Sequence, residues 1–142
     1  MEQSHIINLD EKRDFEVNSS NLKHVRSFCR EVFEKLNINQ ELKDELVLAI
    51  AEAAQNIVKH AYSGQPTGDK MKVEIKFDDH QLTIELFDKG SPAIPQNIKP
   101  RKLDDIKAGG LGTFFISQIM DEVTFKTSAT DWVNHLVLKK NY

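Results

Sequence analysis

The chain has 142 residues, of which 39% are hydrophobic and 29% charged, and its formal net charge is −3. These values are typical of one ordinary globular unit, so we expect a single domain spanning residues 1–142. Acidic and basic residues are interspersed without a basic run, which gives no reason to expect direct binding of nucleic acid.

The cysteine and hydropathy patterns favour a cytoplasmic protein that does not enter a membrane. Cys29 is the single cysteine, so no disulfide can form within the chain, and its position in a helical pattern predicts a core residue. The first residues lack an apolar stretch of signal-peptide length. The longest aliphatic run, LVLAIA at 46–51, is too short to cross a bilayer.

The first half of the chain predicts a strand region followed by two helices. Residues 5–17 are weakly strand-like and are interrupted by a charged turn, DEKRD. The segment NSSN at 18–21 offers side chains that cap a helix, and the apolar residues of 22–36 then follow helical spacing. A second helix is predicted from Gln40 to Tyr62, with its aliphatic residues on one face.

The second half predicts two hairpins that flank a long connection and a third helix. After a Gly- and Pro-containing loop at 63–69, apolar residues alternate with polar ones over 73–86, as in a β-hairpin. Residues 88–110 hold three of the four prolines and no sustained period, and a connection of this length is usually functional or mobile. A helix begins at LGTFF, and 122–140 predict a closing hairpin. The whole pattern indicates an α+β fold.

Three short motifs could carry chemistry, although each has an ordinary structural interpretation. In AEAAQNIVKHAY (51–62), Glu52 and Asn56 are one helical turn apart, as in the solvated stripe of any amphipathic helix. In LFDKG (86–90), Asp88 ends an alternating strand and Gly90 follows, a combination common in turns. In AGGLGTFF (108–115), three glycines lead into a helix, which suits either phosphate binding or a flexible loop.

Other motifs are excluded by their spacing. A dinucleotide fingerprint would need a glycine where Phe115 stands, and a P-loop would need Ser or Thr where Met71 stands. The five histidines and Cys29 show no zinc-ligand spacing, and the chain has no G-x-S-x-G elbow.

In their order along the chain, E-x-x-x-N, D-x-G and G-G-L-G resemble the N, G1 and G2 boxes of the GHKL ATPase superfamily. The stretches AEAAQNIVKHAY and GGLGTFFISQIMDEVTF are similar to those of its anti-sigma-factor serine/threonine-protein kinase branch. The resemblance implies a two-layer α/β sandwich with a mixed, mostly antiparallel sheet, helices on one face and a nucleotide bound beside a mobile lid at 91–108. It also implies ATP and Mg²⁺ as cofactors.

Site roles follow from this resemblance by motif position. Glu52 is the expected general base for a substrate serine, and Asn56 the expected ligand of Mg²⁺. Asp88 is expected to accept a hydrogen bond from the adenine amino group, and Gly90 to let the base approach the backbone. The segment expected to bind the phosphates consists of Gly109, Gly110, Leu111, Gly112 and Thr113. The backbone amide of Thr113 is expected to take part in this binding. Three further residues are expected near the phosphates: Lys59, His60 and Arg101.

The resemblance also implies partners. The expected function is an anti-sigma factor that phosphorylates a serine of a STAS-domain anti-anti-sigma protein and otherwise sequesters a sigma factor, with a homodimer as the expected assembly. One departure is Pro92, which stands where the G1 box often has a second glycine. Two alternatives therefore stay open: a catalytically weak nucleotide-binding module, and a switch kinase that regulates a signalling enzyme other than a sigma factor.

Overall fold

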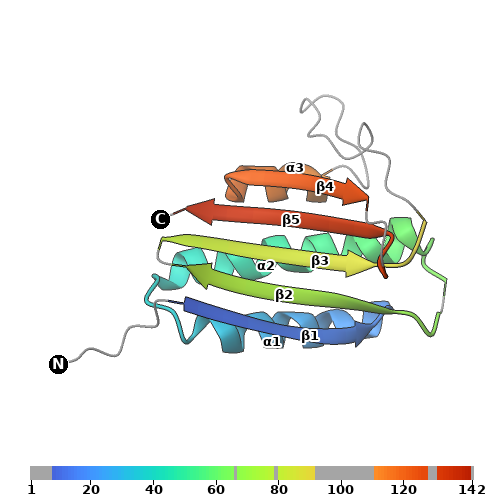
Figure 1. Ribbon diagram of the computed structural model, residues 1–142, viewed down its shortest axis with the longest axis horizontal. Coiled ribbons are helices and arrows are strands. Elements are labelled where there is room, and N and C mark those ends of the chain that lie inside the picture. Colours follow the sequence, from blue (N-terminus) through green and yellow to red (C-terminus); the bar gives the residue numbers. More distant parts are fainter. Residues whose placement is uncertain (1–7, 66, 79, 92–110, 128–130, 142) are drawn as a thin grey trace.

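The computed structural model describes residues 8–65, 67–78, 80–91, 111–127 and 131–141. In this part of the chain, five strands form one sheet, and the helices α1, α2 and α3 all lie on the same face of it (Figure 1). The strands are β1 (Asn8–Glu16), β2 (Lys70–Asp78), β3 (Gln81–Asp88), β4 (Glu122–Thr127) and β5 (Asn134–Asn141). The α+β class and the helices on one face are confirmed.

The sheet order is β1-β2-β3-β5-β4, so the last strand of the chain lies between β3 and β4. All four neighbouring pairs are antiparallel, so the described strands contain none of the parallel pairing that a mixed sheet would have. The two predicted hairpins, β2–β3 and β4–β5, are confirmed.

The charged turn predicted at DEKRD is wrong, because β1 runs through it without interruption. The charges alternate in a way that suits an edge strand. Asp10 pairs in register with Lys76 and Asp14 with Lys72, which places opposite charges across the two strands.

Asparagine side chains begin the first two helical segments. The Oδ1 atom of Asn18 accepts a hydrogen bond of 3.0 Å from the backbone N–H of Asn21, in the short 3₁₀ turn η1 (Ser19–Asn21) that leads into α1 (Leu22–Phe33). Asn39 Oδ1 accepts one of 2.7 Å from Leu42 N at the start of α2 (Gln40–Asn56). These bonds satisfy amides that a helix leaves unpaired at its N-terminus.

The second helix does continue beyond α2, but it changes its winding. Residues Ile57–Ala61 form a π-helical segment, η2, directly after Asn56. Such segments are rare and are frequently found at functional sites.

One apolar core fills the space between the sheet and the helices. Inward-facing residues alternate along β2 and β3, and Cys29 of α1 is fully buried among them, as predicted. Burial raises the pKa of the Cys29 thiol to about 12, so the thiol stays protonated. The largest fully buried side chains are Phe28, Phe33, Leu46, Ile50, Met71, Ile75, Leu82, Ile84, Leu86 and Leu138.

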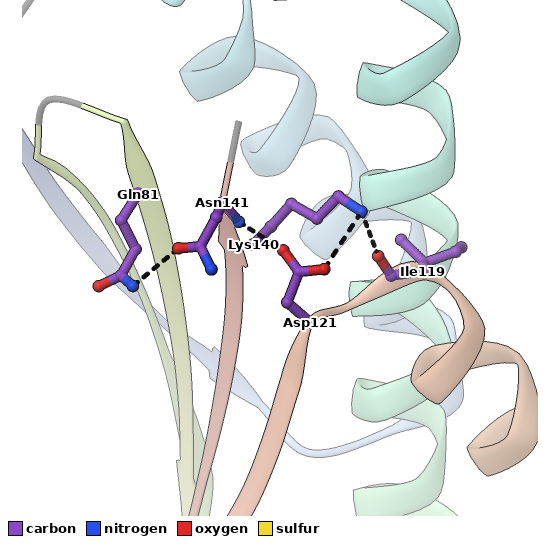
Figure 2. A network of polar contacts seen from close by, with 5 residues as sticks. All are labelled: Gln81, Ile119, Asp121, Lys140 and Asn141. Atoms are coloured by element: carbon purple, nitrogen blue, oxygen red, sulfur yellow. Dashed lines mark hydrogen bonds and ion pairs between the residues drawn. The ribbon is translucent and has the colours of Figure 1, made fainter.

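The end of β5 fastens the C-terminal end of α3 (Leu111–Ile119), as Figure 2 shows. The ammonium group of Lys140 donates a hydrogen bond of 2.8 Å to the carbonyl oxygen of Ile119, and Asn141 N donates one of 2.6 Å to Asp121 Oδ2. Gln81 of β3 completes the network by donating to Asn141 Oδ1 at 2.9 Å. A cation at this end of a helix satisfies a free carbonyl and complements the helix dipole.

Among the described helices, none combines the length and the apolar composition that crossing a membrane requires.

Candidate functional site

The candidate site forms where the C-terminal end of the second helix meets the C-terminal end of β3 (Figure 1). The backbone N–H of Ser91 donates a hydrogen bond of 2.8 Å to the carbonyl oxygen of Ala61, the last residue of η2. This bond joins the D-x-G turn to the helix that carries Glu52 and Asn56. Two of the three sequence motifs are therefore brought together.

Asp88 is the most enclosed polar group of this site. Its side chain is buried, with 3% of the residue exposed, and its Oδ1 atom accepts hydrogen bonds from Asn134 Nδ2 at 2.8 Å and from Gly90 N at 2.9 Å. Burial raises the pKa of Asp88, and the two hydrogen bonds oppose that rise. Within the described part of the chain, no hydrogen bond reaches Oδ2, so that oxygen can accept one from a ligand amino group.

Gly90 is required here by close packing. A Cβ atom at this position would lie 2.5 Å from the carbonyl oxygen of Ala61 and 2.8 Å from Cε1 of Tyr62. The missing side chain thus lets the turn approach the end of η2. Its expected role toward a nucleotide base stays a prediction.

Glu52 and Asn56 occupy the last two turns of α2, and both are half-buried. Neither is shut away in the core, and each keeps part of its surface exposed. Lys59 and His60 follow in η2 and are exposed. The π-helical winding shifts the residues that follow Asn56 from the positions that regular α-helical spacing would give them.

No group of three or more His, Cys, Asp or Glu side chains within the described residues is arranged to hold a metal ion. This is compatible with Mg²⁺ bound mainly through water and phosphate oxygens, since that ion commonly takes only one or two protein ligands. A single amide oxygen, such as that of Asn56, suits such a site.

Only part of the third motif, AGGLGTFF, lies within the residues that the structure describes. Helix α3 packs against α2, and its first turn contains Leu111, Gly112 and Thr113. Their backbone lies in the helix, while their side chains are outside the described part of the chain. The remaining predicted positions, and most of the expected lid, also lie outside it: Pro92, Arg101, Gly109 and Gly110.

Two residues of the site were missed by the sequence interpretation. The Nδ2 atom of Asn134 donates hydrogen bonds to Asp88 Oδ1 and, at 2.9 Å, to the carbonyl oxygen of Ser91. A signal for it existed, because Asn134 shares the inward-facing register of Leu136 and Leu138, where a polar residue is unusual. Tyr62 donates a hydrogen bond to Asp69 Oδ2 and accepts one from Lys89 N, and nothing in the spacing of the sequence indicated that pairing.

The chain is similar to known proteins over most of its length. The family model described as the histidine kinase-like ATPase domain matches residues 15–140. "Serine-protein kinase RsbW" of Staphylococcus aureus (strain bovine RF122 / ET3-1) is 28% identical over an alignment of 101 residues, and the match covers 66% of this chain and 64% of that protein. "Serine-protein kinase RsbW" of Listeria innocua is 30% identical over an alignment of 97 residues, and the match covers 63% of this chain and 61% of that protein.

The match therefore spans somewhat less than two thirds of the length of these relatives. The family model, in contrast, covers the chain almost from end to end, including every candidate site residue named above. The chain belongs to the histidine kinase-like ATPase domain family.

Proposed function

We propose that this protein is an anti-sigma-factor serine-protein kinase. It binds ATP with Mg²⁺, phosphorylates a serine of a STAS-domain anti-anti-sigma protein, and sequesters a sigma factor when that antagonist is phosphorylated and released. The name that the relatives share, serine-protein kinase, supports the reaction class. The parts of the proposal that name a sigma factor, its antagonist and a homodimer rest on the sequence resemblance to the anti-sigma-factor kinase branch.

The observation that carries the proposal is the placement of Asp88. Its carboxylate is buried, and Asn134 Nδ2 and Gly90 N both donate hydrogen bonds to Oδ1. This fixed orientation supports the proposal that Oδ2 accepts a hydrogen bond from the adenine amino group. An acceptor of this kind distinguishes an amino group from a carbonyl, since only the amino group can donate to it. The turn that presents it is hydrogen-bonded to the helix that carries Glu52.

The chain's own residues then have separate tasks. Asp88 orients the adenine ring through its amino group, and the backbone amides at the start of α3 bind phosphate oxygens. Asn56 holds Mg²⁺, which shields the phosphate charge. Bound ATP supplies the phosphoryl group that the acceptor serine receives.

Glu52 is the proposed base. It accepts the proton of the serine hydroxyl as that oxygen bonds to the γ-phosphorus and the bond from this phosphorus to ADP, the leaving group, breaks; it also orients the hydroxyl for the transfer. Phosphoryl transfer depends mainly on positioning and charge stabilisation, so few side chains are needed. A half-buried carboxylate on a well-packed helix fits this task, because it is accessible and rigidly held.

The test is a transfer assay with radiolabelled ATP, Mg²⁺ and STAS-domain proteins from the same genome. We expect label on one serine of one such protein, and we expect Glu52→Ala to reduce the rate by at least about 100-fold, the usual size of a general-base contribution. The mutant should still bind ATP, since Glu52 is not proposed to contact the nucleotide. Glu45→Ala is the matched control, because Glu45 is an exposed glutamate of the same helix.

Full transfer by Glu52→Ala would contradict the assigned base. ATP binding without transfer to any candidate would instead favour the nucleotide-binding module without kinase activity. Transfer to a STAS protein whose cognate target is not a sigma factor would favour the switch kinase that regulates another signalling enzyme.

A further inference from the structure

Tyr62 occupies an unusual place between three segments of the chain. It directly follows the π-helical segment η2, so its backbone is continuous with the helix that bears Glu52 and Asn56. Its ring packs against the D-x-G turn: a Cβ atom placed on Gly90 would lie 2.8 Å from Cε1 of Tyr62.

The hydroxyl group of Tyr62 links the turn to a third segment. It accepts a hydrogen bond of 3.1 Å from Lys89 N, in the middle of the turn, and donates one of 3.1 Å to Asp69 Oδ2. Because a phenol has one proton to donate, the bond to Asp69 leaves the oxygen lone pairs directed at Lys89 N. Asp69 thereby decides which way the hydroxyl points.

Asp69 is itself held in place. Its carbonyl oxygen accepts a hydrogen bond of 3.0 Å from Val17 N, and its backbone N–H donates one of 3.1 Å to Thr67 Oγ1. Burial raises the pKa of Tyr62 to about 12, and the bond to Asp69 acts in the same direction. The hydroxyl therefore keeps its proton at neutral pH, and both hydrogen bonds persist.

We propose that Tyr62, oriented by Asp69, is a positioning residue that sets the Asp88–Gly90 turn against the end of the helix that bears Glu52. The hydrogen bond from Lys89 N to the Tyr62 hydroxyl fixes the middle of the turn. The hydrogen bond from Ser91 N to the carbonyl oxygen of Ala61 fixes the residue that follows it. The two hydrogen bonds thereby keep Asp88, the proposed contact of the base, in a fixed position relative to Glu52, the proposed general base. This inference rests on the proposed function for its meaning, but its geometry can be tested without a substrate.

The first measurement uses the intrinsic fluorescence of Trp132, the single tryptophan of the chain. The ammonium group of Lys89 lies over its ring, 5.3 Å from the ring centroid, so a displaced turn changes the surroundings of the indole. We expect Tyr62→Phe and Asp69→Ala to change the emission and the iodide quenching of Trp132 in the nucleotide-free protein. Asp69→Asn should leave both near the wild-type values, because the amide oxygen still accepts from the hydroxyl.

The second measurement is the equilibrium affinity for ATP with Mg²⁺. Tyr62→Phe and Asp69→Ala should each weaken binding about fivefold, the effect of losing one ordinary hydrogen bond. Asp69→Asn should restore most of the affinity, and the double mutant should be no weaker than either single mutant, because the two residues act as one unit. Asp44→Ala, which removes an exposed acid near the other end of α2, is the control and should change neither quantity.

The outcomes separate the two proposals. Unchanged Trp132 emission and unchanged ATP affinity in a folded Tyr62→Phe protein would overturn the positioning role. Loss of thermal stability without a change in emission or affinity would also overturn it, since that result assigns Tyr62 a purely structural role. Failure of the wild-type protein to bind ATP would overturn the proposed function, while the fluorescence comparison would still decide whether Tyr62 positions the turn.

Discussion

Gly90 shows at the scale of one residue that the D-x-G turn has no room for a side chain at its glycine. Its backbone does not need the left-handed region, since no positive φ occurs there, but the space for a Cβ atom is already filled by Ala61 and Tyr62. The constraint is therefore steric. A sequence interpretation can note the glycine, but it cannot identify the neighbours that exclude a side chain.

We predict that Gly90→Ala destabilises the protein by about 1–3 kcal/mol, the usual cost of an added group in a packed site. The added carbon would lie 2.5 Å from a backbone oxygen, which cannot rotate away as the end of a side chain could. Gly68→Ala is the matched control. Its Cβ would meet nothing within 4 Å, so its free energy of unfolding should stay within about 0.5 kcal/mol of wild type. Urea unfolding of both variants would check this, and equal stability of the two would contradict it.

At the scale of elements, the hairpin β2–β3 carries two glutamates whose pKa values shift in opposite directions. Glu74 and Glu85 are direct cross-strand partners on the sheet face that the helices leave uncovered. Burial and a hydrogen bond shared with Asp10 raise the pKa of Glu74. Burial also acts to raise that of Glu85, but hydrogen bonds to Lys76 and His135 outweigh it and lower the pKa.

The two shifts predict opposite pH profiles of stability. The lowered pKa of Glu85 contributes stability that is present above its unfolded value, near 4.5, and is lost as the pH falls through the folded value. Glu85→Gln should therefore cost about 1 kcal/mol at pH 7 and less at acid pH. The raised pKa of Glu74 contributes stability that is present below about 4.5 and is lost as the pH rises, so Glu74→Gln should be close to neutral at pH 7.

Urea unfolding of the wild type and both variants between about pH 3 and pH 7.5 measures these differences. The two substitutions are chemically identical and lie side by side, so each serves as the control for the other. Parallel pH profiles for Glu74→Gln and Glu85→Gln would contradict the opposite shifts.

The elements also show how far the sequence could be interpreted. Alternation of apolar residues predicted β2 and β3, both hairpins are confirmed, and the predicted cap within residues 18–21 is the side chain of Asn18. The charged residues of β1 were misread as a turn, because an edge strand can carry charges on both faces while its partner strand supplies opposite charges. The π-helical winding of η2 carries no periodicity that distinguishes it from an α-helix over five residues.

At the scale of the whole molecule, the strand order places β3 at the centre of the sheet, with β1 and β4 at its edges. The motifs along the sequence predicted which residues matter, but not this order, because the pairing of β3 with β5 joins segments about 50 residues apart. Asn134 could not be assigned to Asp88 for the same reason. Local patterns predict elements, whereas long-range pairing decides which of them meet.

This arrangement predicts the pattern of amide hydrogen exchange. The amides of β3, which is paired on both sides, should exchange most slowly, since they open only with the whole sheet. The amides of β1 and β4, each paired on one side, should exchange faster. Exchange followed by mass spectrometry after pepsin digestion would check this, and β4 exchanging as slowly as β3 would contradict it.

The insertion of β5 between β3 and β4 also has a consequence for biosynthesis. While the ribosome is still making the chain, β1, β2 and β3 can pair as soon as they emerge, but β4 has no neighbour in the sheet until β5 follows it. Asp88 acquires its Asn134 partner only at that moment. A nascent chain therefore cannot complete the proposed nucleotide site around Asp88 until β5 has emerged from the exit tunnel.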